Sequence, residues 1–104
     1  MEKINKLLNF LTEQPNDCFL RHALALEYVK IQNDELALEA FTTLLSIDEN
    51  YIGSYYHLAK LYERQNNIPQ AIATYKKGIE IATKLKDNHA RNELQMSLDD
   101  WDDE

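Results

Sequence analysis

The sequence predicts an all-α protein built as an α-solenoid, in which antiparallel helix pairs stack on one another. Two observations point to helices. Among 104 residues there are only two glycines and two prolines, and 44% of the residues are apolar, which is the composition of a folded helical protein. In addition, no segment alternates apolar and polar residues with the β-branched content typical of strands. A third observation, an internal repeat of 34 residues, points to stacked pairs.

The repeat places residues of the same kind 34 positions apart along the chain. Small residues at these positions let two helix backbones approach, and an aromatic residue nearby fills the space where the helices diverge. Each pair leaves one apolar side uncovered, so a neighbouring pair must stack on it. The matched residues are Leu24 with Leu58, Ala25 with Ala59, Tyr28 with Tyr62, Asn33 with Asn67, Ala37 with Ala71, Phe41 with Tyr75, and Ile47 with Ile81.

Apolar periodicity predicts six helices, near residues 3–13, 18–31, 34–47, 51–65, 68–85 and 88–101. Pro69 falls in a first turn, where its missing N–H removes no hydrogen bond. Gly78 lies inside a helix, where close packing against a neighbour explains it. Residues that favour the N-cap position precede the helices from the second onward. These expected caps are Asp17, Asn33, Asn50, Asn67, and either Asp87 or Asn88.

The first and last helices are each apolar on one side only. On the first, the shared face matches the second helix of a half repeat and consists of Leu7, Phe10 and Leu11. On the last, the apolar residues form a single stripe, made of Ala90, Leu94, Leu98 and Trp101. A one-sided helix of this kind closes the end of a solenoid.

Residues 18–85 resemble the tetratricopeptide repeat family, in the form of its small bacterial-type proteins. The first copy departs from the family pattern at Arg21, where a large aromatic residue is usual, and both copies lack the closing proline, with Glu49 and Thr83 in its place. The second copy matches closely, through Tyr55, Leu58, Ala59, Tyr62, Ala71 and Tyr75. The resemblance implies one domain over residues 1–104 that winds as a right-handed superhelix. Its expected parts are a half repeat at 1–17, repeats at 18–51 and 52–85, a capping helix at 86–101 and an acidic tail at 102–104.

The resemblance implies a protein–protein interaction module, an adaptor or scaffold that holds a peptide or protein in a short concave groove without catalysis. The first helix of each pair would line this groove. The groove would be apolar near Phe19 and Leu26 and cationic near Lys60 and Arg64, which suits a partner with apolar and acidic groups. The expected partner-binding residues are Phe19, His22, Leu26, Val29, Tyr56, Lys60, Glu63, Arg64 and Arg91.

Other interpretations of these residues stay open. The charged residues also fit an ordinary solvated face, and Leu26 and Val29 also fit burial against the half repeat. The alternative function is a self-assembling structural unit, a homodimer formed through the open N-terminal end or the groove. An enzyme ranks third.

Charge is unevenly spread along the chain. The net charge of −7 argues against a nucleic-acid partner, because neutralising phosphates needs a clustered positive surface. Residues 60–91 carry seven basic and three acidic side chains, whereas residues 92–104 carry no basic and six acidic side chains. The acidic end has two explanations. It keeps the end of the repeat soluble, with Trp101 ending the apolar stripe, or it docks as an acidic aromatic segment into a basic groove of its own or a neighbouring chain.

Cys18 and His22 lie one helical turn apart, a spacing that suits a nucleophile and base or two metal ligands. No motif supplies a third group, and an isolated cysteine at a helix start usually serves packing. We therefore expect no catalytic site, no metal and no cofactor. With one cysteine, and with neither a signal peptide nor an apolar run long enough for a membrane span, the sequence predicts a cytoplasmic protein without a membrane partner.

Overall fold

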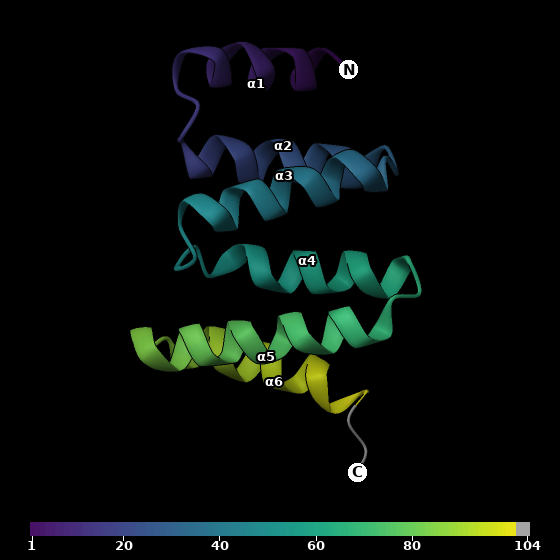
Figure 1. Ribbon diagram of the computed structural model, residues 1–104, viewed down its shortest axis with the longest axis vertical. Helices are drawn as coiled ribbons and strands as arrows, with labels where there is room; N and C mark the ends of the chain where they lie inside the picture. The colour runs from purple at the N-terminus through teal and green to yellow at the C-terminus, as the bar shows by residue number, and fades with distance from the viewer. Residues whose placement is uncertain (102–104) are drawn as a thin grey trace. The chain divides into compact units, whose positions relative to one another are not determined.

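The computed structural model describes residues 1–101 and shows six α-helices and no strand among them (Figure 1). The all-α helical-repeat prediction is confirmed, and the predicted helix ends lie within two residues of the observed ones. The expected acidic tail at 102–104 lies outside the described residues. No helix within residues 1–101 has both the length and the apolar content to cross a membrane. The helices are α1 (Glu2–Glu13), α2 (Cys18–Lys30), α3 (Asp34–Ile47), α4 (Gly53–Arg64), α5 (Ile68–Leu85) and α6 (Asn88–Asp99).

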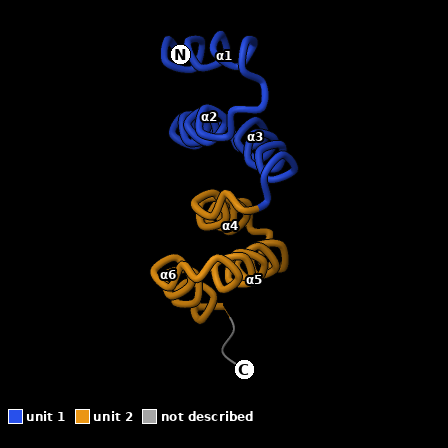
Figure 2. The backbone as a smooth tube through the Cα atoms, turned by 90° about the vertical axis from the view of Figure 1, so that its left-hand side faces the viewer, with its two compact units in different colours: residues 1–49 blue, residues 50–104 orange. Residues whose placement is uncertain are grey.

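The chain forms two compact units, Met1–Glu49 and Asn50–Glu104, shown in separate colours in Figure 2. The first unit holds α1, α2 and α3, and the second holds α4, α5 and α6. Each unit therefore contains one helix pair of the repeat together with one further helix.

Four of the predicted N-caps are confirmed. In each, a side-chain oxygen accepts a hydrogen bond from the backbone N–H three residues on, as an N-cap does. The bonds run from Leu20 to Asp17, from Leu36 to Asn33, from Gln70 to Asn67 and from Ala90 to Asp87. The cap predicted at Asn50 is wrong. Helix α4 begins at Gly53 with Ile52 as N-cap, and backbone bonds from Ser54 to Tyr51 (3.2 Å) and from Tyr55 to Ile52 (3.3 Å) form its first turn.

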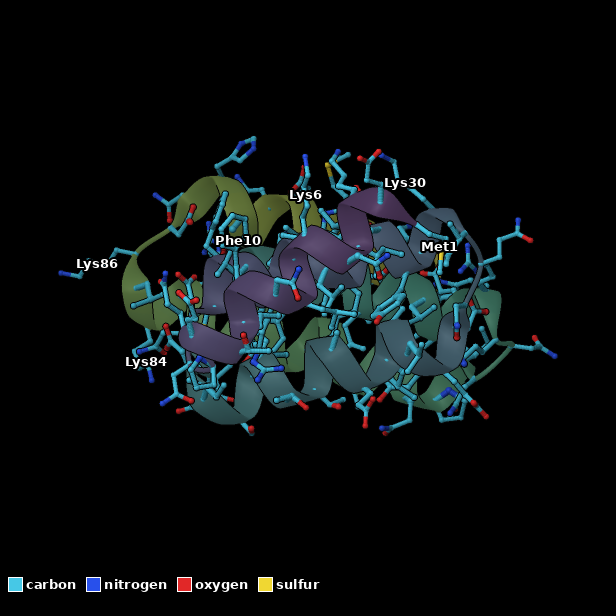
Figure 3. The ribbon with its side chains drawn as sticks, turned by 90° about the horizontal axis from the view of Figure 1, so that it is seen from above. Met1, Lys6, Phe10, Lys30, Lys84 and Lys86 are labelled. Carbon is cyan, nitrogen blue, oxygen red and sulfur yellow. The ribbon has the colours of Figure 1, made fainter. Side chains whose placement is uncertain are left out.

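Helices α2, α4 and α5 end in the same left-handed turn. Within residues 1–101, the non-glycine residues with positive φ are Gln32 (61°), Asn66 (62°) and Lys86 (60°), and the Lys86 side chain extends outward in Figure 3. The residue after each donates its N–H to a carbonyl five positions back, which closes the helix. These bonds are Asn33 to Tyr28 (2.9 Å), Asn67 to Tyr62 (2.8 Å) and Asp87 to Ala82 (2.9 Å). Because Asn33, Asn67 and Asp87 also cap the next helix, one residue fixes both sides of each reversal.

In the first unit, α2 packs against α3 on one side and α1 on the other. The inward face of α1 agrees only in part with the predicted one, Leu7, Phe10 and Leu11, because Leu11 is buried and Leu7 is half-buried but Phe10 is exposed. Ile4 and Leu11 are buried, whereas Phe10 is 54% exposed and is labelled in Figure 3, which looks onto α1. Ile4 and Leu11 lie seven residues apart and so share a stripe that excludes Phe10. The rest of the buried core comprises Leu24, Ala25 and Tyr28 of α2 with Ala37, Ala40, Phe41 and Leu44 of α3.

In the second unit, α5 lies between α4 and α6 and packs against both. The contact is close because Gly78 has no side chain. A Cβ at this position would lie 2.8 Å from the Tyr55 Cβ of α4 and 2.9 Å from the Leu94 Cδ1 of α6. The prediction that close packing explains Gly78 is confirmed. The largest buried side chains here include Tyr55, Tyr62, Tyr75, Ile81, Leu94 and Leu98.

Candidate functional site

The predicted partner-binding residues of the first unit all lie on α2, and together with Lys30 we call them the α2 surface. Phe19 stands at one end and is 69% exposed, and Lys30 is exposed at the other. Leu26 and Val29 are half-buried between them. The His22 ring meets the edge of the Phe41 ring of α3, with centroids 6.0 Å apart, so the core positions this imidazole. The α2 surface is therefore apolar along most of its length.

A charged cluster ties α2 to α1 beside this surface. The Glu27 carboxylate lies 3.4 Å from the Lys30 ammonium and 3.5 Å from that of Lys3. Burial acts to raise the pKa of Glu27, but hydrogen bonds and charge from Lys30 and Lys3 hold it below its ordinary value. The carboxylate therefore stays ionised, and it pairs with two ammonium groups that are themselves mostly exposed.

The first unit also has a hollow that the sequence reasoning missed. Its volume is about 300 Å³, and it mixes apolar walls with one basic and one acidic side chain. The guanidinium of Arg21 is held there by a 2.9 Å bond from Nε to the Pro15 carbonyl. The sequence signal was Arg21 itself, which occupies the position where the repeat pattern places a large aromatic residue. The hollow is lined by Leu8, Arg21, Leu24, Tyr28, Leu36, Glu39, Ala40 and Thr43.

In the second unit, three of the predicted residues, Tyr56, Lys60 and Glu63, lie together on α4, and we call them the α4 surface. Glu63 is at its centre. Its Oε2 accepts a 2.6 Å hydrogen bond from the Tyr75 hydroxyl of α5 and a 2.8 Å bond from the Trp101 indole N–H. Its Oε1 lies 3.6 Å from the Lys60 ammonium, and the side chain is 17% exposed. The carboxylate is thus removed from most of the solvent and compensated by three donors, as a buried charge requires.

Aromatic rings complete the α4 surface. The Lys60 ammonium lies 5.4 Å from the centre of the Tyr56 ring and 6.0 Å from that of Tyr75, within the range of cation–π attraction. Burial raises the pKa of Tyr75, and the hydrogen bond to Glu63 and its negative charge raise it further. Tyr75 therefore keeps its proton and remains a donor to Glu63.

The remaining two predicted residues, Arg64 and Arg91, are exposed. Arg64 ends α4, and Arg91 lies in the first turn of α6, where its guanidinium is 3.5 Å from the Asn92 side-chain oxygen. The structure thus gathers Tyr56, Lys60 and Glu63 into one network. Trp101, which sequence reasoning connected only with the apolar stripe and the tail, belongs to the same network.

The pair Cys18 and His22 is accounted for by packing. The Cys18 thiol lies 3.9 Å from the Leu44 carbonyl. Burial raises its pKa, and the nearby Asp48 and Asp17 carboxylates add to this effect. A thiol with a raised pKa is a weak nucleophile and a weak metal ligand. No group of three or more metal-binding side chains is found among residues 1–101.

A family model described as tetratricopeptide repeat matches residues 20–51 and 52–85. The chain belongs to the tetratricopeptide repeat family. The matched segments agree with the two repeats predicted from the offset of 34 residues. Proteins of this family are generally protein–protein interaction modules and non-catalytic scaffolds.

Relatives of the tetratricopeptide repeat protein agree with this assignment. An uncharacterised protein, ycf37 of Porphyra purpurea, is 33% identical over 89 residues, which are 80% of this chain and 51% of the relative, so the chain spans about half that protein's length. A tetratricopeptide repeat domain protein of Salinibacter ruber, solved by NMR, is 44% identical with a TM-score of 0.77, covering 81% of this chain and 85% of that one. A Bordetella parapertussis protein, 23% identical, shares the fold with a TM-score of 0.80, covering 91% and 83% of the two chains.

Proposed function

We propose that this tetratricopeptide repeat protein is an adaptor that binds a peptide or protein through the α2 and α4 surfaces and carries out no catalysis. The main support for this proposal is that the first helix of each repeat has side chains outside the core, and that these side chains differ between the two repeats. The α2 surface offers apolar contact at Phe19, Leu26 and Val29, whereas the α4 surface offers charge at Lys60 and Glu63. A partner with apolar and acidic groups suits this pair of surfaces.

Affinity capture with matched variants tests the proposal. Tagged wild-type protein is used to capture partners from a lysate of the source organism, and captured proteins are identified by mass spectrometry. Phe19→Asp replaces an exposed aromatic ring with a charge, so we expect it to lose the specific partner while circular dichroism stays unchanged. Met96→Asp is the control, because Met96 is as exposed but lies on α6, outside both surfaces.

The charged surface is tested in the same way. Arg64→Glu reverses one exposed charge beside the α4 surface and should weaken capture of an acidic partner. Lys76→Glu makes the same charge change at an exposed position of α5 and should leave capture intact. Identical partner profiles for the wild type, Phe19→Asp and Arg64→Glu would refute the assignment of these surfaces.

Self-assembly is the second candidate, favoured by the apolar side chains that α1 leaves exposed. Phe10 and Leu8 are both exposed large apolar residues on this helix. Two copies that pair through α1 would bury these side chains. Sedimentation velocity over a range of concentrations tests this: a dimer that dissociates on Phe10→Glu substitution supports it, and a monomer at every concentration contradicts it.

A further inference from the structure

We propose that the α4 surface is a recognition site for a tryptophan side chain with acidic neighbours, and that this chain's own Trp101 is its resident occupant. The proposal deepens the proposed function, on which it rests, by naming what the α4 surface binds. A partner that uses this surface must present the same chemistry and displace Trp101.

The hydrogen bond between Trp101 and Glu63 carries the proposal. The indole N–H donates to Glu63 Oε2 over 2.8 Å, across 38 residues of sequence. Trp101 follows the last helix and is an exposed residue, with 42% of its surface accessible, yet its indole N–H is held at this carboxylate. A tryptophan N–H can only donate, and a carboxylate can only accept, so the two groups are chemically matched.

The repeat scaffold does not require this polar site. Counting back 34 residues, the first repeat has Val29 in place of Glu63, Phe41 in place of Tyr75, and Leu26 in place of Lys60. Carboxylate, hydroxyl and ammonium are therefore absent together from one repeat and present together in the other. The first repeat has apolar side chains at all three positions, with Phe41 buried in the core and Leu26 and Val29 half-buried, so the shared fold does not require the polar set of the second.

Acidic neighbours fit the charge around the site. Asp99 and Asp100 directly precede Trp101, and residues 60–91 carry seven basic and three acidic side chains. Lys60 already balances Glu63, which lets an acidic segment approach a site whose centre is a carboxylate. Because Trp101 is tethered to the same chain, its effective concentration at the site is high, and an external ligand competes against it.

A peptide-binding experiment on the full chain tests the proposal. The probe is a fluorescein-labelled peptide of residues 97–104, Ser-Leu-Asp-Asp-Trp-Asp-Asp-Glu, followed by fluorescence anisotropy. Removal of the resident indole in Trp101→Ala should tighten peptide binding at least tenfold relative to the wild type. In that background, Glu63→Gln should weaken binding about tenfold, because a hydrogen bond to a charged group is lost. Glu80→Gln, an equal change at an exposed position of α5, is the control.

A second peptide separates recognition from general stickiness. Replacing its tryptophan with phenylalanine keeps an aromatic ring but removes the N–H donor, so we expect about tenfold weaker binding. This arm stays decisive even if Glu63→Gln unfolds the chain, which thermal melts would reveal. Absence of peptide binding to Trp101→Ala, equal binding to Trp101→Ala and the wild type, or indifference to the phenylalanine substitution would each overturn the proposal.

Trp101 also reports on its own occupancy, because it is the single tryptophan of the chain. Its fluorescence in the wild type should be better protected from acrylamide than in the free peptide, and Glu63→Gln should remove much of that protection. Equal quenching in the wild type and Glu63→Gln would contradict resident occupancy. These results are independent of the lysate capture through Phe19, so the proposed adaptor function can stand where the tryptophan site fails, and the reverse.

Discussion

The two repeats use one backbone pattern to build different interiors and different surfaces. In the first, Leu44 is fully buried at the position where the second has Gly78, and Arg21 stands where the second buries Tyr55. In the second repeat, Tyr55 of α4 fills the space left by Gly78 of α5, whereas in the first Leu44 of α3 takes the buried position and the Arg21 guanidinium is held by the Pro15 carbonyl. The comparison shows that the repeat fixes the reversals and the small contact positions, whereas the volume between the helices can be filled from either side.

The largest expected effect on stability comes from removing the buried Leu44 side chain from the first repeat. Leu44→Ala removes a side chain that has no exposed surface. In the second repeat Tyr55 fills the equivalent space, but the first repeat has no such aromatic side chain to do so. We expect a loss of about 2–5 kcal/mol in the free energy of unfolding, measured by urea denaturation. A loss below about 1 kcal/mol would show that the neighbouring helices collapse into the space, and would weaken the comparison.

Adding volume to the second repeat should be the next largest effect. In Gly78→Ala the new methyl group would lie 2.8 Å from Tyr55 Cβ and 2.9 Å from Leu94 Cδ1. Overpacking typically costs about 1–3 kcal/mol, of which the better helix propensity of alanine returns up to about 1 kcal/mol. We expect a net loss of stability in thermal and urea melts.

Gly53→Ala is the control for this substitution. Gly53 is the first residue of α4, and apart from its chain neighbours and the adjacent helix backbone nothing lies within 4 Å of a Cβ built there. The same change in composition should therefore be neutral or slightly stabilising. Equal losses for Gly53→Ala and Gly78→Ala would contradict the packing explanation.

The sequence predicted the elements that rest on local chemistry. Helix ends and four caps followed from side chains such as Asp17 and Asn67, which bond to backbone only three residues away. The cap at Asn50 was mispredicted because backbone turns can begin a helix without a side chain. The inward face of α1 was predicted only in part: Leu11 is buried as expected, but Phe10 is exposed and the burial of Ile4 was missed.

The network at Glu63 could not be predicted from the sequence because it depends on packing between distant segments. The charge pattern suggested that an acidic aromatic tail docks on basic residues, yet the Trp101 indole binds a carboxylate. A hydrogen bond of this kind depends on the angle and height at which α4, α5 and α6 meet, which periodicity does not specify. The one signal in the sequence was that the first repeat has Val29 and Phe41 where the second has Glu63 and Tyr75.

The polar network itself should contribute an intermediate amount to stability. Tyr75→Phe reproduces the residue of the first repeat, Phe41, and leaves Glu63 one donor short in a site that is mostly covered. We expect a loss of about 1.5 kcal/mol, the value typical of a hydrogen bond to a charged group. The free energy of unfolding is measured by urea denaturation.

A double-mutant cycle tests the pairing of these two residues. Adding Glu63→Val to Tyr75→Phe completes the first-repeat pair, Val29 with Phe41, and should recover part of the loss. Strictly additive losses would mean that Glu63 and Tyr75 act independently, and the structural comparison between the repeats would then lose its energetic basis.

The smallest expected effect is on the pH dependence of stability, and it arises from one position at which the two repeats differ. His57 of α4 occupies the place of Ala23 in the first repeat, and its ring meets the edge of the Tyr56 ring with centroids 5.6 Å apart. Burial lowers the pKa of His57 below 6.5, and the Glu93 carboxylate only partly opposes this. The folded state therefore binds fewer protons than the unfolded state, so stability is full above pH 6.5 and declines as the pH falls below it.

His57→Ala restores the residue of the first repeat and should remove this part of the pH dependence. The measured quantity is the change in unfolding free energy between pH 7.5 and pH 5.5, from urea denaturation of both proteins. The wild type should lose more stability than His57→Ala over this interval, whatever their difference at pH 7.5. Carboxylates titrate in both proteins and cancel in the comparison. A wild type that loses no more than the variant would show that the folded protein accommodates a charged imidazole at this position, and that burial in the second repeat does not discriminate against it.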